Sequence, residues 1–318
     1  MPFAFENAAA PATPAAGKIY IYAKTDKNLY IKDEDGVEKQ VTTASASTVY
    51  TGTCDGRLTL TTAVPVTTSD VTAATNVYFT PTGQGGQVAL YTASVWTLYT
   101  LTERTLSLSG LTTSQPYDIF LYDASGTLTL EAVAWTSNTA RATALVLQNG
   151  VYCKTGALDR RYVGTIKMQA TGQCEDSKLR RFVWNMYNRH QRDFWVFDTT
   201  NSYSYTTGTW RASNTLTALR VEVVIGLSED PIFLNHQYMI SGGSGFAGIC
   251  LDNTTQNDAR TKQGFLFPIT GSSVYNLPVA IGYHFFQMVE KGGTSVTFYG
   301  DNNTPNDIQM GMSGNIAA

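Results

Sequence analysis

From about residue 72 onward, short apolar and aromatic segments recur every eight to twelve residues, with Gly, Ser and Asp between them. Examples lie at residues 77–79, 117–122, 144–147 and 283–289. Aromatic and β-branched residues favour a pleated surface, and Gly favours turns. This spacing predicts antiparallel β-sandwich or jelly-roll-like domains, so we expect a mainly β fold. The absence of a sequence repeat of 20–50 residues argues against a solenoid or a propeller.

Changes in composition divide the chain into five segments. They are an extended N-terminal docking arm at 1–17, a small β-meander at 18–43, a linker or extended segment at 44–71, a β-sandwich-like domain at 72–160, and a second β domain with one helix at 161–318. The meander is predicted from alternating apolar and polar residues separated by polar turns. A sheet of this size is marginal alone and needs a neighbour to cover it.

The N-terminal arm is rich in Ala and Pro, with Phe3 and Phe5 at its start. Such a segment cannot bury enough apolar surface to fold by itself. We therefore expect residues 1–17 to bind a different protein, with Phe3 and Phe5 as apolar anchors. The arm has no basic n-region, so it is not predicted to be a secretory signal.

One segment, residues 175–188, has apolar residues at helical spacing and two acidic residues in its first turn. We expect one amphipathic helix here, packed on a sheet through Leu179, Phe182, Val183, Met186 and Tyr187. Arg180, Arg181 and Trp184 lie off this stripe. Arg and Trp are enriched at interface anchors, so we predict an oligomer contact at these three residues.

The charge balance excludes a general nucleic-acid coat and favours internal ion pairs. The formal net charge is −3, and only 15% of the residues are charged. Residues 154–192 nevertheless contain nine basic and three acidic residues, and we expect salt bridges within the chain or to neighbouring subunits. No apolar run approaches the ~20 residues of a membrane span, so we expect no membrane insertion and no nucleic-acid partner. The four cysteines form no CxxC pair, and we expect free buried thiols.

No catalytic, cofactor-binding or metal site is predicted. His190, His236 and His284 are far apart, and the chain has no GxSxG elbow, P-loop or GxGxxG motif. The two acidic residues needed for glycan hydrolysis can be brought together by the tertiary structure, which the sequence does not show, so a glycan-degrading enzyme stays an alternative. The loops at 252–258 and 301–307 carry oxygen ligands that suit Ca²⁺, but Asn, Asp and Pro are also turn residues, and this question stays open.

Three blocks carry a resemblance to proteins of tailed bacteriophages. Residues 17–41, GKIYIYAKTDKNLYIKDEDGVEKQV, resemble a short module near the start of many tailed-phage virion proteins. Residues 160–189 contain RRYVGT, TGQCEDS and RFVWNMYNR and are similar to a block of phage structural proteins, in which Thr stands where this chain has Cys. The third block is GYH at 282–284, with Glu290 and FYG at 298–300.

The resemblance implies a virion structural protein, made in the cytoplasm of the host bacterium and without catalytic residues. It also implies a homotrimer that binds other virion proteins, in the tail or the capsid, through its N-terminal arm. We expect a tail fibre or spike that touches the host surface, with a surface glycan as a further partner. The alternatives are a capsid head fibre or decoration protein, a glycan-degrading tailspike enzyme, and a carbohydrate-binding module with no virion role.

Overall fold

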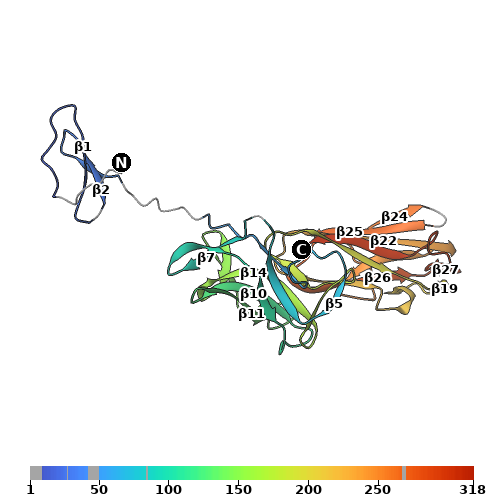
Figure 1. Ribbon diagram of the computed structural model, residues 1–318. Helices are drawn as coiled ribbons and strands as arrows, with labels where there is room; N and C mark the ends of the chain where they lie inside the picture. Colours follow the sequence, from blue (N-terminus) through green and yellow to red (C-terminus); the bar gives the residue numbers. More distant parts are fainter. Residues whose placement is uncertain (1–8, 27, 42–49, 84, 267–269) are drawn as a thin grey trace. The chain divides into compact units, whose positions relative to one another are not determined.

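The chain is mainly β, as the strand spacing predicts, and among the described residues its strand pairs are antiparallel except for β16 (Arg180–Arg181) with β21 (Arg220–Ile225). The computed structural model in Figure 1 describes residues 9–26, 28–41, 50–83, 85–266 and 270–318. The chain divides into two compact units, Met1–Tyr50 and Thr51–Ala318. No helix in the described part of the chain is long and apolar enough to cross a membrane.

The N-terminal unit contains the predicted meander. Its sheet has the order β1 (Tyr20–Ala23), β2 (Leu29–Lys32) and β3 (Glu38–Gln40), each strand antiparallel to the next. Part of the segment expected as an extended arm lies against this sheet, because Lys32 Nζ donates to the carbonyl of Pro11 at 2.9 Å and Pro14 is buried. Phe3 and Phe5 lie outside the described residues.

The first half of the larger unit contains two small sheets. One has the order β4 (Gly56–Thr59), β6 (Asn76–Pro81) and β9 (Arg104–Ser107), and the other pairs β7 (Gln87–Thr92) with β8 (Val95–Thr100). All of β4 is buried, so the segment expected as a linker or extended structure contributes a core strand.

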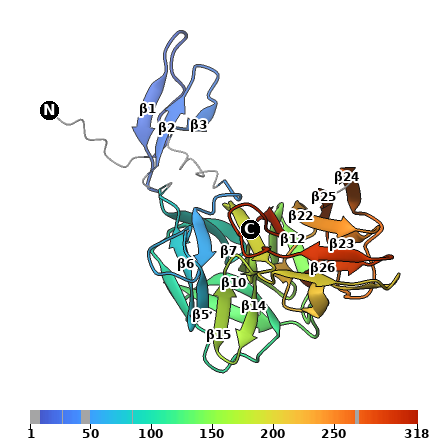
Figure 2. The same cartoon turned by 90° about the vertical axis from the view of Figure 1, so that its right-hand side faces the viewer.

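A sheet of 13 strands runs through the larger unit. Its main path is β11 (Thr127–Ala134), β10 (Pro116–Ala124), β14 (Ala157–Ala170), β15 (Gln173–Asp176), β16 (Arg180–Arg181), β21 (Arg220–Ile225), β26 (Gly282–Lys291) and β20 (Trp210–Ala212). The strands off this path are β5 (Val71–Ala74), β12 (Leu145–Gln148), β13 (Val151–Lys154), β17 (Val183–Asn185) and β23 (Phe246–Leu251). Figure 2 shows β10, β14 and β15 together. Since β14 passes through residues 160 and 161, the predicted domain boundary falls inside a strand.

The C-terminal part of the chain forms most of a sheet of seven strands. Its path is β18 (Gln191–Phe197), β28 (Gly311–Ala317), β22 (Pro231–Gly242), β25 (Thr270–Pro278) and β24 (Lys262–Leu266), with β19 (Ser202–Ser204) and β27 (Val296–Tyr299) off it. A short 3-10 turn, η1 (Ser213–Thr215), follows β20. Figure 1 shows β7 and β11 toward one end of the larger unit, and β24 and β27 toward the other.

Two apolar cores lie in the larger unit. The core near β7 and β10 includes Phe79, Ile119 and Ile166, whereas the core around β21, β22 and β26 includes Val223 and Phe286. Strand β14 supplies residues to both cores, so the two halves share their central strand. The four cysteines are free and buried.

The prediction of an amphipathic helix at residues 175–188 is wrong. The segment contains the end of β15, then β16 and β17, and a tight turn separates β15 from β16. The hydroxyl of Ser177 accepts hydrogen bonds from the backbone N–H groups of Leu179 and Arg180, which fixes that turn. Val183 pairs with Ile166 of β14. These ladder bonds, together with burial on both faces, override the helical spacing of the apolar residues.

A closed ion pair joins β10 to the loops beside it. Arg141 Nε donates to Asp118 at 2.7 Å, and an Nη of Arg141 donates to the carbonyl of Gly226 at 2.6 Å. Asp118 also accepts from the hydroxyl of Thr165 at 2.7 Å. The side chains of Asp118 and Arg141 are 3% and 10% exposed, so both charges are compensated inside the protein.

Candidate functional site

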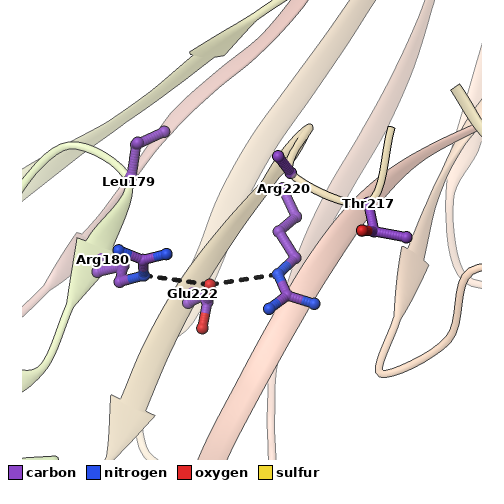
Figure 3. Close-up of a pocket in the computed structure, with 6 residues that line it drawn as sticks. Leu179, Arg180, Thr217, Arg220 and Glu222 are labelled. Carbon is purple, nitrogen blue, oxygen red and sulfur yellow. Dashed lines mark hydrogen bonds and ion pairs between the residues drawn. The ribbon is translucent and has the colours of Figure 1, made fainter. Parts of the chain in front are cut away.

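Two adjacent cavities beside β16 and β21 form a charged pocket, part of which is drawn in Figure 3. Their volumes are about 290 and 240 Å³. They share Arg180, Arg220 and Glu222. The larger cavity is also lined by Leu179, Thr217 and Ala218, and the smaller by Ser114, Asn138, Lys167, Gln169, Phe182 and Tyr283.

The strand pairing determines which side chains meet here. Strands β16 and β21 run parallel, and Arg180 lies opposite Glu222 in their register. Arg220 precedes Glu222 by two residues, so both project from the same face of β21. This 2-residue alternation brings two guanidinium groups to one carboxylate, and Figure 3 shows Glu222 between Arg180 and Arg220.

Both oxygens of Glu222 accept hydrogen bonds. Its Oε1 accepts from the Nε of Arg180 and the Nε of Arg220, both at 3.2 Å, and its Oε2 accepts from the hydroxyl of Tyr283 at 2.6 Å. Burial alone would raise the pKa of Glu222, but the hydrogen bond from Tyr283 and the two arginine charges outweigh burial and lower that pKa. Glu222 is therefore held as a carboxylate.

Arg180 has a second acidic partner. Its Nη1 donates to Glu175 Oε2 at 2.9 Å, and the other oxygen of Glu175 accepts from the hydroxyl of Ser177. Arg220 has Glu222 as its carboxylate partner and stacks its guanidinium over the ring of Phe285 at 4.8 Å. Both arginine side chains are about one-third exposed, at 34% and 31%, so the outer faces of the guanidinium groups meet solvent.

Lys167 lines the smaller cavity and is 6% exposed. Its ammonium lies over the rings of Phe182 and Tyr283, at 4.7 and 4.2 Å from their centroids. Among the residues that the structure describes, no carboxylate or other hydrogen-bond acceptor pairs with this ammonium. Burial lowers the pKa of Lys167, and the nearby Arg180 charge lowers it further against the opposing effect of Glu222.

A close backbone approach positions the rim of this cavity. Gly282 has a φ of +115°, and a Cβ there would lie 2.4 Å from the carbonyl oxygen of Asn138. The same carbonyl accepts a hydrogen bond from the N–H of Tyr283 at 2.8 Å. Gly282 thus allows Asn138 and Tyr283 to line one cavity.

The charges around the pocket do not balance. Lys167, Arg180 and Arg220 supply three positive charges, while Glu175 and Glu222 supply two negative charges. Planar guanidinium groups and an ammonium bind carboxylate and phosphate oxygens. The pocket is therefore suited chemically to bind an anion.

Of the residues predicted as an oligomer contact, only Arg180 lines this pocket. Trp184 is 2% exposed and stacks on Tyr162, while Arg181 is 5% exposed and donates to Asp176 and to the carbonyl of Asp193. Trp184 and Arg181 are therefore buried within one chain. The homotrimer itself stays a prediction.

Six of the nine basic residues between 154 and 192 form ion pairs within the described part of the chain, which is one of the two outcomes expected for them; they are Lys154, Arg160, Arg180, Arg181, Arg189 and Arg192. Arg189 pairs with Glu229 and Asp230, and Arg192 pairs with Asp176. These contacts are ion pairs of the folded unit.

The histidines form local contacts. His236 is fully buried, and its Nδ1 lies 2.9 Å from the carbonyl of Gly248, so Nδ1 carries the proton. His284 Nδ1 lies 2.7 Å from Asp252. Burial lowers the pKa of His236 to about 4. Within the described ranges, no group of three or more His, Cys, Asp or Glu side chains is placed to hold a metal ion.

The Asn- and Asp-rich loops use their oxygens for their own turns. Asn253 Oδ1 accepts from the N–H groups of Thr254 and Thr255, and Asp301 Oδ1 accepts from the N–H of Asn303. This geometry is that of Asx turns, which favours the turn interpretation of these residues over the Ca²⁺ interpretation.

A second candidate surface is one face of the small N-terminal sheet. In the strand register, Ile21 lies opposite Ile31, which lies opposite Lys39. Because side chains alternate across a strand, the positions two residues away lie on the same face. This face, which we call the apolar sheet face, carries Ile21, Ile31 and Lys39. Ile21 is 49% exposed, and the residues that flank strands β1 and β3, namely Ile19, Val37 and Val41, are 60%, 49% and 45% exposed.

Sequence reasoning missed the pocket. Lys167, Arg220, Glu222 and Tyr283 come from three strands, and the sequence does not predict them as site residues. The alternation of Arg220 and Glu222 indicates one strand face, but nothing in the sequence places Lys167 or Tyr283 beside it. No protein-family model matches the chain, and no curated protein or solved structure is significantly similar to it.

Proposed function

We propose that this chain is a structural component of a tailed-phage particle, docked through its N-terminal unit and exposing its larger β unit to the host surface. The observation that carries the proposal is the apolar sheet face. Exposed apolar side chains on one face of a small sheet are typical of a surface that another protein covers. The docking partner in this proposal is another virion protein, and the assembled form is a homotrimer.

The resemblance to phage virion proteins supports this division of roles. Residues 17–41, which carry the first resemblance, coincide with the strands β1 to β3 of the N-terminal unit. The module that resembles a virion segment is thus a compact unit with its own sheet. The tail fibre or spike and the capsid head fibre or decoration protein share this organisation, and position in the particle distinguishes them.

A glycan-degrading enzyme is the competing proposal. Of the described residues that line the two cavities, Glu222 is the carboxylate, and both of its oxygens accept hydrogen bonds. A general acid must be protonated near neutral pH, whereas the pKa of Glu222 is lowered. This chemistry favours binding over hydrolysis. Purified protein should release no fragments from capsule, lipopolysaccharide or peptidoglycan, and release that Glu222→Gln abolishes would contradict the proposal.

The direct test is the presence of the chain in particles. Antibodies against the full chain should label purified particles in electron micrographs, and the label position distinguishes head from tail. Purified particles that lack the chain would overturn the proposal.

Two neighbouring residues test the docking face. Ile21→Lys places a charge on the apolar sheet face, whereas Tyr20→Lys places it on the opposite face of the same strand. Because both residues are exposed, both variants should stay folded. In complementation of a phage lacking the gene, Ile21→Lys should be absent from particles and Tyr20→Lys present. Equal incorporation would remove the apolar sheet face as the docking surface.

The arm is tested separately. Replacing Phe3 and Phe5 together by Ala should leave a soluble, folded chain that incorporates poorly into particles, since the two rings are the proposed anchors. Normal incorporation of this double variant would remove that role.

A further inference from the structure

We infer that the cavity lined by Lys167, Arg220 and Tyr283 is a subsite for the carboxylate of an acidic sugar. This inference deepens the proposed function and rests on it, because it names the chemical class of the host-surface ligand. Its first support is the buried Lys167 side chain, whose ammonium is open to the cavity and has no acidic hydrogen-bond partner in the described chain.

Lys167 is 6% exposed as a residue, but its ammonium nitrogen is not among the enclosed polar atoms without a partner, so the ammonium is open to the cavity. The rings of Phe182 and Tyr283 supply cation–π contacts, but they leave the hydrogen-bond donors of the ammonium unmatched. The carboxylate that lines the same cavity, Glu222, already accepts hydrogen bonds from Arg180, Arg220 and Tyr283. An anion that enters the cavity would supply the missing acceptor.

The arginines leave donors for the same anion. Arg220 uses Nε for Glu222, and its two terminal amino groups meet no acceptor in the part of the chain that the structure describes. Arg180 uses Nε and Nη1, which leaves Nη2. These donors and the ammonium line one cavity, where a planar carboxylate can accept from a guanidinium and an ammonium together.

The remaining lining points to a sugar as the carrier of the carboxylate. Ser114, Asn138 and Gln169 are exposed and line the same cavity. Hydroxyl and amide side chains both donate and accept, which suits the hydroxyl groups of a saccharide. A cavity of about 240 Å³ is small for an extended ligand and suits one ring of a chain.

The experiment is calorimetric titration of the full chain with galacturonate, galactose and inorganic phosphate. Galactose is the neutral control for the sugar, and phosphate is the control for an anion without a sugar. We expect galacturonate to bind about tenfold or more tightly than either control. Equal affinity for galactose and galacturonate would overturn the inference that the site recognises a carboxylate. Binding of phosphate as tight as that of galacturonate, or tighter, would overturn the inference that it recognises a sugar.

Two variants and a matched control locate the site. Lys167→Met removes the ammonium and should weaken galacturonate binding about tenfold or more. Lys178→Met removes another lysine that lies over an aromatic ring, that of Trp195, but lies outside the cavity, and it should leave affinity unchanged. Arg220→Gln is the second variant, for the case in which Lys167→Met does not fold. The Arg220 side chain is about one-third exposed, so this variant should fold, and it should also weaken galacturonate binding. Unchanged affinity in a folded Lys167→Met or Arg220→Gln variant would overturn the inference.

The outcomes separate this inference from the proposed function. A chain found in particles that does not bind galacturonate refutes the sugar subsite alone. A chain that binds galacturonate but is missing from particles refutes the virion role alone.

Discussion

The Asp118–Arg141 pair and the Glu222 pocket use the same residue types with different results. At Asp118 each charge has a partner, and the two side chains are 3% and 10% exposed. At Glu222 two arginines share one carboxylate, about a third of each arginine is exposed, and a buried lysine stands nearby without an acidic partner among the described residues. We propose that the Asp118–Arg141 pair stabilises the fold, whereas the partly exposed arginines and the lysine beside Glu222 bind a ligand.

The largest expected effect is on the Asp118–Arg141 pair. Asp118→Ala leaves the buried Arg141 guanidinium uncompensated and should lower the free energy of unfolding by about 3–5 kcal/mol. Urea denaturation followed by circular dichroism measures this difference. Glu229→Ala, which breaks an exposed ion pair with Arg189, is the matched control and should cost under about 1 kcal/mol. Equal effects of the two substitutions would break the comparison.

The core also contains the fully buried His236, and the free energy of unfolding should therefore fall at acidic pH. The folded-state pKa of His236 is lowered to about 4 from an ordinary 6.5. Between these values the unfolded chain binds a proton that the folded chain does not, so stability is fully present above pH 6.5 and falls by about 3 kcal/mol toward pH 4. Unfolding free energies across this range should be flatter for His236→Gln, and parallel curves would contradict this assignment.

At the pocket, Glu222→Gln should have opposite effects on stability and on binding. Since the two arginine partners are partly solvated, we expect a loss of only about 1–2 kcal/mol of unfolding free energy. Removal of the competing carboxylate should strengthen galacturonate binding. Denaturation and calorimetry on the same variant give both numbers, and weaker binding by a folded variant would show that Glu222 is part of the ligand contacts.

The smallest stability change is expected for Lys167→Met. The ammonium is buried without an acidic partner, so its loss should leave the unfolding free energy within about 0.5 kcal/mol of the wild type, or raise it. A loss as large as that of Asp118→Ala would mean that Lys167 is structural. Thermal denaturation beside the Lys178→Met control decides between these outcomes.

The strand content and the meander were predictable because their signal is local. The alternation of apolar and polar residues around Ile21 and Ile31 predicts strands without any knowledge of tertiary contacts. At residues 175–188 the local signal misled, since Phe182, Val183 and Trp184 owe their conformation to pairing with β14 and to burial on both faces. The pocket depends on a parallel pairing of β16 with β21 and on the approach of Tyr283, and such long-range contacts leave no pattern in neighbouring residues.

The most direct test of the difference between the two networks is the titration of Lys167 itself. With lysine labelled by ¹³C at Cε, NMR follows each side chain against pH, and the signal lost in Lys167→Met identifies this residue. We predict a pKa below the ordinary 10.5 in the free protein and a rise on addition of galacturonate, because a bound carboxylate stabilises the ammonium. A Lys167 titration that galacturonate leaves unchanged would contradict the account.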